Sequence, residues 1–145
     1  MCEKISERGQ RMSEPVGRIF VLEGSHIHDI TSFYDEVNRV LMTNEDWTLG
    51  ASLDALNDLL YGGYGELYEI THTRIVWRDH ALARAALGRI ATREYYEAKI
   101  ARPEVFNVEH ARRSLAELDA GHGPTYFDLV CEVFADHPEI RFDLA

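Results

Sequence analysis

The sequence predicts an α/β domain in which helices pack on a small three-stranded parallel sheet. Three short apolar segments, at residues 18–24, 71–77 and 140–144, have the composition of strands, and helical patterns separate them. Strands that alternate with helices favour a parallel sheet with helices on its faces, in two or three layers. The 145 residues suffice for one domain and are too few for two.

Composition and charge narrow the range of functions. Hydrophobic residues make up 46% of the chain and charged residues 28%, as is typical of folded, soluble proteins. The net charge of -10 argues against binding to nucleic acid and fits a basic protein partner, although solubility alone also explains it. No apolar run of membrane-spanning length and no secretory signal is evident, so we expect a cytoplasmic protein without membrane contact. Cys2 and Cys131 are expected to be free thiols.

The amino-terminal segment predicts a tail followed by a strand. Residues 1–16 are polar and unpatterned, which indicates a mobile tail before a domain at 17–145. The segment RIFVLEG at 18–24 is rich in Ile, Phe, Val and Leu and ends at a glycine. This is the pattern of a strand that is covered on both faces.

Two helices are expected between the first and second strands. The first covers residues 33–42, and either Thr31 or Ser32 is suited to cap it. The second begins at Ser52 and is ended by the glycines at 62–63. Its buried stripe is expected to consist of Leu53, Leu56 and Leu60.

The second half of the chain is mostly helical. After a strand at 71–77, helix-forming segments predict a helical insertion at about 87–122. A broadly apolar helix then begins at Thr125 and cannot continue through Pro138. Residues 140–144 alternate between apolar and polar side chains and form the third strand.

An acidic pair stands out on the second helix. If the leucine stripe is buried, Asp54 and Asp58 lie one turn apart on the exposed side. Like charges at this spacing destabilise a helix, and no Lys or Arg between Leu49 and Gly65 relieves them. Asp54 is favoured by the positive end of the helix, but Asp58 is not. These two residues alone do not distinguish a solvated helix face from a binding face.

Aromatic residues flank the acidic pair. Trp47 precedes the helix, while Tyr61 and Tyr64 follow it in a glycine-rich loop that allows close approach of a partner. Aromatic side chains beside charges are typical of interface hot spots. Packing on the helix flank as part of the core is the alternative, and we expect it for Trp47.

These segments resemble the barstar family of ribonuclease inhibitors. The resemblance rests on LGASLDALNDLL at 49–60, on IVWRD at 75–79, and on the first strand, last helix and last strand in the family's order. It implies a barstar-like fold and a non-enzymatic, cytoplasmic inhibitor without cofactor or metal. The implied partner is a small basic guanyl-specific microbial ribonuclease, bound one to one, and the chain is most similar to inhibitors of RNase Sa-type enzymes.

The resemblance also implies roles for individual residues. Asp58 would enter the active site of the ribonuclease in place of a substrate phosphate, with support from Asp54, and Asp136 would be a further acidic contact. Asn57 stands where the family has an aromatic residue, and Thr48 stands at another aromatic position of the family. The remaining contacts would be made by Asn57, Tyr61, Tyr64, Trp47, Thr48 and Gly50.

Other functions were compared with this interpretation. Within the inhibitor class, an immunity protein against a delivered ribonuclease toxin is an alternative. A small hydrolase would use Asp54 and Asp58 as its carboxylates and His72 or His80 as a proton shuttle, but no nucleophile or phosphate-binding motif supports it. An oligomerisation domain would need an exposed apolar patch in place of an acidic one.

A metal site is a minor alternative in the segment GSHIHD. Alternate side chains of an extended segment would bring His26 and His28 together, with Asp29 next to them. No third ligand is evident, and histidine is more common as a surface or turn residue. We therefore expect no metal.

Overall fold

The computed structural model describes residues 17–145 and confirms the α/β fold class. Three strands, β2 (Ile19–Glu23), β3 (Arg74–Arg78) and β4 (Arg141–Leu144), form a parallel sheet in the order β2-β3-β4. The predicted tail at 1–16 lies outside the described residues.

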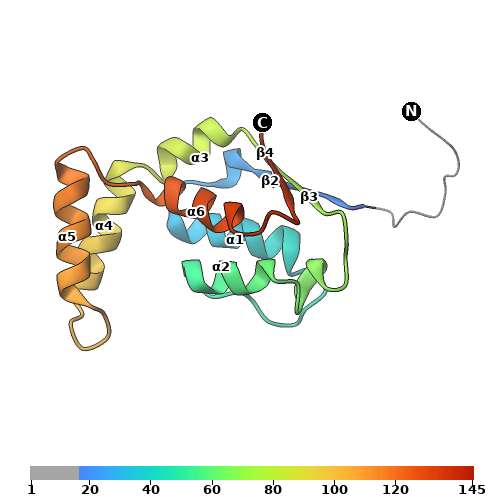
Figure 1. Cartoon of the computed structure of the whole chain (residues 1–145), viewed down its shortest axis with the longest axis horizontal. Helices are drawn as coiled ribbons and strands as arrows, with labels where there is room; N and C mark the ends of the chain where they lie inside the picture. Colours follow the sequence, from blue (N-terminus) through green and yellow to red (C-terminus); the bar gives the residue numbers. More distant parts are fainter. Residues whose placement is uncertain (1–16) are drawn as a thin grey trace, which may run out of the picture.

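Six α-helices and two short 3-10 helices connect and follow these strands within the described part of the chain (Figure 1). The α-helices are α1 (Ile30–Leu41), α2 (Leu53–Leu60), α3 (His80–Ala86), α4 (Arg89–Ile100), α5 (Val108–Asp119) and α6 (Tyr126–Ala135). The 3-10 helices are η1 (Gly24–His26) and η2 (Gly65–Leu67). The predicted connections are therefore confirmed: α1 and α2 lie between the first two strands, and four helices lie between the last two.

One face of the sheet carries the hydrophobic core. Trp77 of β3 is fully buried at its centre, with its ring 5.5 Å from that of Phe33 on α1 and 5.0 Å from that of Phe127 on α6. In Figure 1, α1 and α6 lie beside the sheet and α2 lies beyond them. Helix α2, which carries the acidic pair, therefore lies on the outer side of the core helices and packs against them.

The other face of the sheet is open. Arg74 and Asp143 form an ion pair of 2.6 Å across β3 and β4, and Arg78 and Glu23 form one of 2.8 Å across β3 and β2. Ile19 of β2 is 62% exposed on this side. The expectation that the first strand is covered on both faces is therefore wrong, and of the two-layer and three-layer alternatives the structure has the two-layer one. Ion pairs between neighbouring strands lie on the second face instead.

The cap of α1 also differs from the expectation. Asp29 caps the helix, and its carboxylate accepts a hydrogen bond from the backbone N–H of Ser32. The Ser32 hydroxyl in turn accepts from the backbone N–H of Asp29. This reciprocal pair is a capping box, so Ser32 belongs to the first turn and Thr31 has no capping role.

The segment predicted as a helical insertion forms α4 and α5, which pack against each other (Figure 1). The buried hydroxyl of Thr92 on α4 accepts a hydrogen bond of 2.7 Å from the backbone N–H of Tyr126, at the start of α6. The ring of Tyr95 on α4 contacts that of Tyr126 at 4.9 Å. The pair α4 and α5, here called the hairpin, is therefore fixed to the core helix α6. Its status as an insertion at 87–122 stays a prediction.

Candidate functional site

The local sequence places both aspartates on the exposed side of α2. The helix begins after Ser52, as predicted, and the Ser52 side chain caps it by accepting a hydrogen bond from the backbone N–H of Ala55. Asp54 and Asp58 are both exposed. The buried side consists of Leu56, Leu59 and Leu60, while Leu53 is only partly buried.

The charges of the two aspartates are not neutralised by the described part of the protein. Within residues 17–145, neither Asp54 nor Asp58 forms an ion pair or a side-chain hydrogen bond. Tyr64 lies close to Asp58. Burial raises the pKa of the tyrosine hydroxyl, and the negative charge of Asp58 raises it further. The helix therefore presents carboxylates whose hydrogen-bonding capacity is available to a partner.

Trp47 and Tyr64 form an aromatic pair at one edge of this surface. Their ring centroids are 4.9 Å apart, with the planes inclined at 53°. Trp47 is 44% exposed, so the expectation that it packs into the core is wrong. Leu49, two residues later, is buried instead, and the indole lies on the tyrosine ring at the surface.

Glycines shape the loop that brings Tyr64 back beside α2. Gly62 has a φ of 83°, and Gly65 has a φ of 74°. A Cβ atom on Gly65 would lie 2.7 Å from the carbonyl oxygen of Leu41, so this position requires glycine for packing as well as conformation. Gly63 has open space around it.

Asn57, expected at the rim of the interface, connects two helices. Its Oδ1 atom accepts a hydrogen bond of 2.7 Å from Nε2 of His137, which directly follows the cap of α6. The imidazole is 1% exposed and also lies under the ring of Tyr61, in an edge contact of 4.7 Å between centroids. His137 was not predicted as a site residue, because a single histidine before a proline carries no signal of such a contact.

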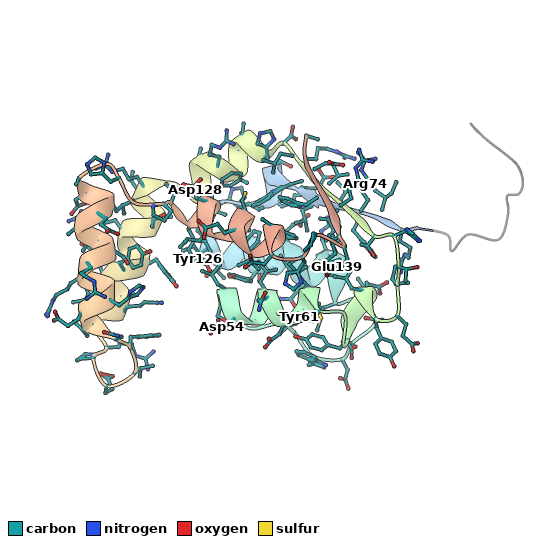
Figure 2. All side chains as sticks on the ribbon, viewed as in Figure 1. Asp54, Tyr61, Arg74, Tyr126, Asp128 and Glu139 are labelled. Carbon is teal, nitrogen blue, oxygen red and sulfur yellow. The ribbon has the colours of Figure 1, made fainter. Side chains whose placement is uncertain are left out.

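The same contact brings the end of α6 to the middle of α2. Asp136, predicted as a further acidic contact, is the exposed cap of α6 and precedes His137 in the chain. In Figure 2, Asp54 and Tyr61 lie towards opposite ends of α2, and Glu139 lies near the Tyr61 end. The end of α6 and the residues after it therefore lie beside the Tyr61 end of α2.

The two candidate residues in the loop before α2 have fewer contacts. Thr48 and Gly50 are both exposed. A Cβ atom on Gly50 would meet nothing within 4 Å, so the packing of the described residues does not require glycine there. The backbone carbonyl of Gly50 accepts a hydrogen bond of 3.0 Å from Ser52, which fixes the entry to α2.

The candidate metal ligands take part in structural contacts. His26 Nδ1 lies 2.8 Å from Oε1 of the buried Glu36, and Asp29 caps α1. Between residues 17 and 145, no group of three His, Cys, Asp or Glu side chains is arranged to hold a metal ion. Across the same residues, every helix is too short or too polar to span a membrane.

The two histidines considered as proton shuttles do not accompany the acidic pair. His80 contacts the carbonyl oxygen of Ala145 at 2.9 Å, at the end of the sheet, and His72 is exposed before β3. The surface around α2 can thus bind cationic groups through its carboxylates, and aromatic rings and a buried histidine contact fix its geometry.

A family model described as Barstar (barnase inhibitor) matches residues 17–98. The matched segment includes β2, α1, α2 and β3 and ends within α4, so Asp54 and Asp58 lie inside it and Asp136 lies outside. No match was found among curated proteins.

Proposed function

Because the chain belongs to the barstar family, we propose that it inhibits a small basic microbial ribonuclease by covering the active site of that enzyme. The complex contains one inhibitor and one ribonuclease and forms in the cytoplasm. The family match, together with the uncompensated carboxylates of α2, carries this proposal. The sequence resemblance favours a guanyl-specific ribonuclease of the RNase Sa type.

Asp58 is the proposed substitute for a phosphate of the RNA. A ribonuclease active site holds cationic and hydrogen-bonding groups that bind phosphate oxygens, and a carboxylate presents similar acceptor oxygens to them. Asp58 lies in the middle of the exposed side, near Tyr64, whereas Asp54 lies one turn closer to the start of the helix. Asp54 then adds charge from the edge of the contact.

The acidic helix is preorganised for binding. The Ser52 cap, the buried leucines and the hydrogen bond from His137 to Asn57 hold α2 before any partner arrives. A rigid donor or acceptor loses little conformational entropy on association, which favours affinity. The net charge of -10 also attracts a basic enzyme at long range.

The surrounding residues supply the rim of the interface. Trp47, Tyr61 and Tyr64 present partly or largely exposed rings, as is common in protein contacts of high energy. Thr48, Gly50 and Asp136 lie in exposed segments next to α2 and complete the proposed contact. Asn57 contributes mainly through the position of the helix, because its Oδ1 atom is occupied by His137.

We further propose that the protein itself is not an enzyme. Asp54 and Asp58 are exposed to solvent, and the histidines considered as shuttles lie elsewhere. Catalytic carboxylates usually sit in enclosed sites that shift their pKa values. Isolated protein should therefore leave RNA intact, and RNA cleavage that copurifies with it through several steps would contradict this proposal.

The test is a titration of small guanyl-specific microbial ribonucleases with this protein while RNA cleavage is followed. We expect loss of cleavage at one equivalent for at least one enzyme. The variant Asp58→Ala should lose most of this inhibition. The matched control is Asp35→Ala, which removes the same charge from an exposed position on α1. Absence of inhibition across the panel, or equal inhibition by both variants, would contradict the proposal.

A further inference from the structure

A groove separates the beginning of α2 from the hairpin. It has a volume of about 670 Å³ and is lined by residues of α2, α4 and α6 and of the loop before α5, among them Asp54, Tyr95, Lys99, Phe106 and Leu129. Figure 2 shows Asp54 towards the end of α2 that faces the hairpin. The acidic surface of α2 and the groove are therefore continuous, with Asp54 common to both.

The hairpin wall of the groove carries fixed positive charge. The Lys99 ammonium lies 4.5 Å from the ring centroid of Tyr95 and 5.3 Å from that of Phe106. The guanidinium of Arg102 lies 5.9 Å from the ring centroid of Phe106. Such cation–π contacts orient a cation without neutralising its charge. Within residues 17–145, Lys99 has no carboxylate partner, and Arg102 reaches only Glu104, at 3.9 Å.

We propose that this groove receives a carboxylate-bearing loop of the ribonuclease that binds α2. The proposal rests on the proposed function, because a ribonuclease placed over α2 must also face the adjoining hairpin. Lys99 and Arg102 then pair with an Asp or Glu beside the basic active site of the enzyme, and the rings of Tyr95 and Phe106 pack against the apolar part of the loop. The hairpin thereby selects the target.

Charge complementarity gives this selection its physical basis. A basic ribonuclease without an acid at this place would bring its own cations against Lys99 and Arg102, and like charges brought together at an interface weaken binding. A ribonuclease with an acid there gains pairs that are partly desolvated by aromatic walls. Binding to α2 alone does not distinguish a ribonuclease that has this acid from one that lacks it.

The test uses a ribonuclease that the wild-type protein inhibits and compares two double variants. Lys99→Glu/Arg102→Glu reverses the charges of the groove. Arg112→Glu/Arg113→Glu makes the same change in net charge at two exposed positions of α5 that do not line the groove. Both variants make the protein more acidic, so non-specific attraction to a basic enzyme rises equally in both.

We expect the groove variant to bind the ribonuclease about 10- to 100-fold more weakly despite its greater negative charge. The control variant should bind as tightly as the wild type or slightly more tightly. Equal affinities of the two variants would overturn the proposal. If Asp58→Ala still abolishes inhibition in that case, the function as inhibitor stands and only the role of the groove falls. If no ribonuclease is bound by the wild type, both proposals fall.

A second measurement needs no variant and so does not depend on the folding of one. Carbodiimide treatment of the wild-type complex joins a lysine amine to a carboxylate that contacts it. Mass spectrometry should find Lys99 coupled to an Asp or Glu of the ribonuclease. Coupling of Lys99 to a second copy of this chain, or to its own residues only, would contradict the proposed occupant.

Discussion

Asn57 and His137 lie 80 residues apart in the chain, and their side chains share a hydrogen bond of 2.7 Å. The bond connects the middle of the acidic helix to the end of the last helix. Since the imidazole is buried, it depends on Asn57 for one of its hydrogen bonds. The position of Asp58, the next residue, is therefore coupled to a distant part of the core.

Asn57→Ala should destabilise the protein. The substitution leaves a buried N–H group of His137 without its acceptor, and we expect a loss of roughly 1–3 kcal/mol in the free energy of unfolding. Urea unfolding followed by circular dichroism measures it. The control is Asp54→Ala, an exposed change on the same helix that should stay within about 0.5 kcal/mol of the wild type. Similar unfolding midpoints for Asn57→Ala and the control would show that the bond contributes nothing.

The acidic pair is expected to lower the stability of the free protein and to raise its affinity for the ribonuclease. Asp58→Ala relieves the repulsion from Asp54, so we expect the free protein to gain a few tenths of a kcal/mol. Its affinity for the ribonuclease should fall about 30-fold or more, since removing a central charge leaves cationic groups of the enzyme unpaired. Asp54→Ala relieves the same repulsion but also loses the favourable interaction of Asp54 with the start of the helix, so its stability should change little. It should lose much less affinity than Asp58→Ala. Isothermal calorimetry and urea unfolding of both variants test this, and small, equal affinity losses would remove the assignment of Asp58 as phosphate mimic.

Glu36 should make stability depend on pH in the acid range. Its side chain is 2% exposed, and it accepts hydrogen bonds from Arg39, from the backbone N–H of Glu23 and from His26. Burial alone would raise the pKa of this carboxyl, but these bonds outweigh it and lower the pKa from 4.5 to about 2. Because the folded-state pKa is depressed, the stabilisation is present above pH 4.5 and is lost as the pH falls towards 2.

We expect this loss to be roughly 2 kcal/mol, somewhat less than the full shift implies, because Arg39 and His26 are about half exposed and screened. Glu36→Gln removes the titrating group. Unfolding free energies at several pH values between 2 and 6 should therefore fall less steeply in this variant than in the wild type. Glu94→Gln, an exposed change on α4, is the control and should follow the wild type. An unchanged slope in Glu36→Gln would contradict the account of this site.

The two tryptophans should report binding separately. Trp47 is 44% exposed beside Tyr64, whereas Trp77 is fully buried at the centre of the core. Acrylamide should therefore quench mainly Trp47 in the free protein, and binding of the ribonuclease should protect it. Trp47→Phe should abolish the quenchable component. If quenching of Trp47 is unaffected by a saturating ribonuclease that lacks tryptophan, Trp47 does not belong to the interface.

Local patterns were sufficient for much of the fold. Helices were predicted to begin at Ser52 and at Thr125, and both residues cap their helices by accepting backbone hydrogen bonds. The parallel sheet followed from the alternation of strands and helices. The cap of α1 was not predictable in the same way, because Asp29, Thr31 and Ser32 are all suitable caps. The reciprocal bond between Asp29 and Ser32 decides among them.

The rest depends on contacts between distant segments. The exposure of Trp47 is set by a tyrosine that a glycine turn returns to the same surface. The second strand begins at Arg74, later than expected, after a loop in which Glu69 and His72 adopt positive φ angles that no sequence pattern announced. The contact of His137 with Asn57 and the groove beside the hairpin exist only once α6 has packed. Exposed acids were thus predictable from helical periodicity, and their surroundings were not.

The central claim, that α2 occupies the phosphate site of a ribonuclease, is tested most directly by competition. The affinity of the wild-type protein would be measured for a ribonuclease that it inhibits, at increasing concentrations of a 3′-mononucleotide. The mononucleotide binds at the same phosphate site of the enzyme. We predict that the apparent Kd rises in proportion to the nucleotide concentration, because Asp58 and the phosphate exclude each other. An apparent Kd that stays constant while the nucleotide is bound would show a ternary complex and would contradict the claim.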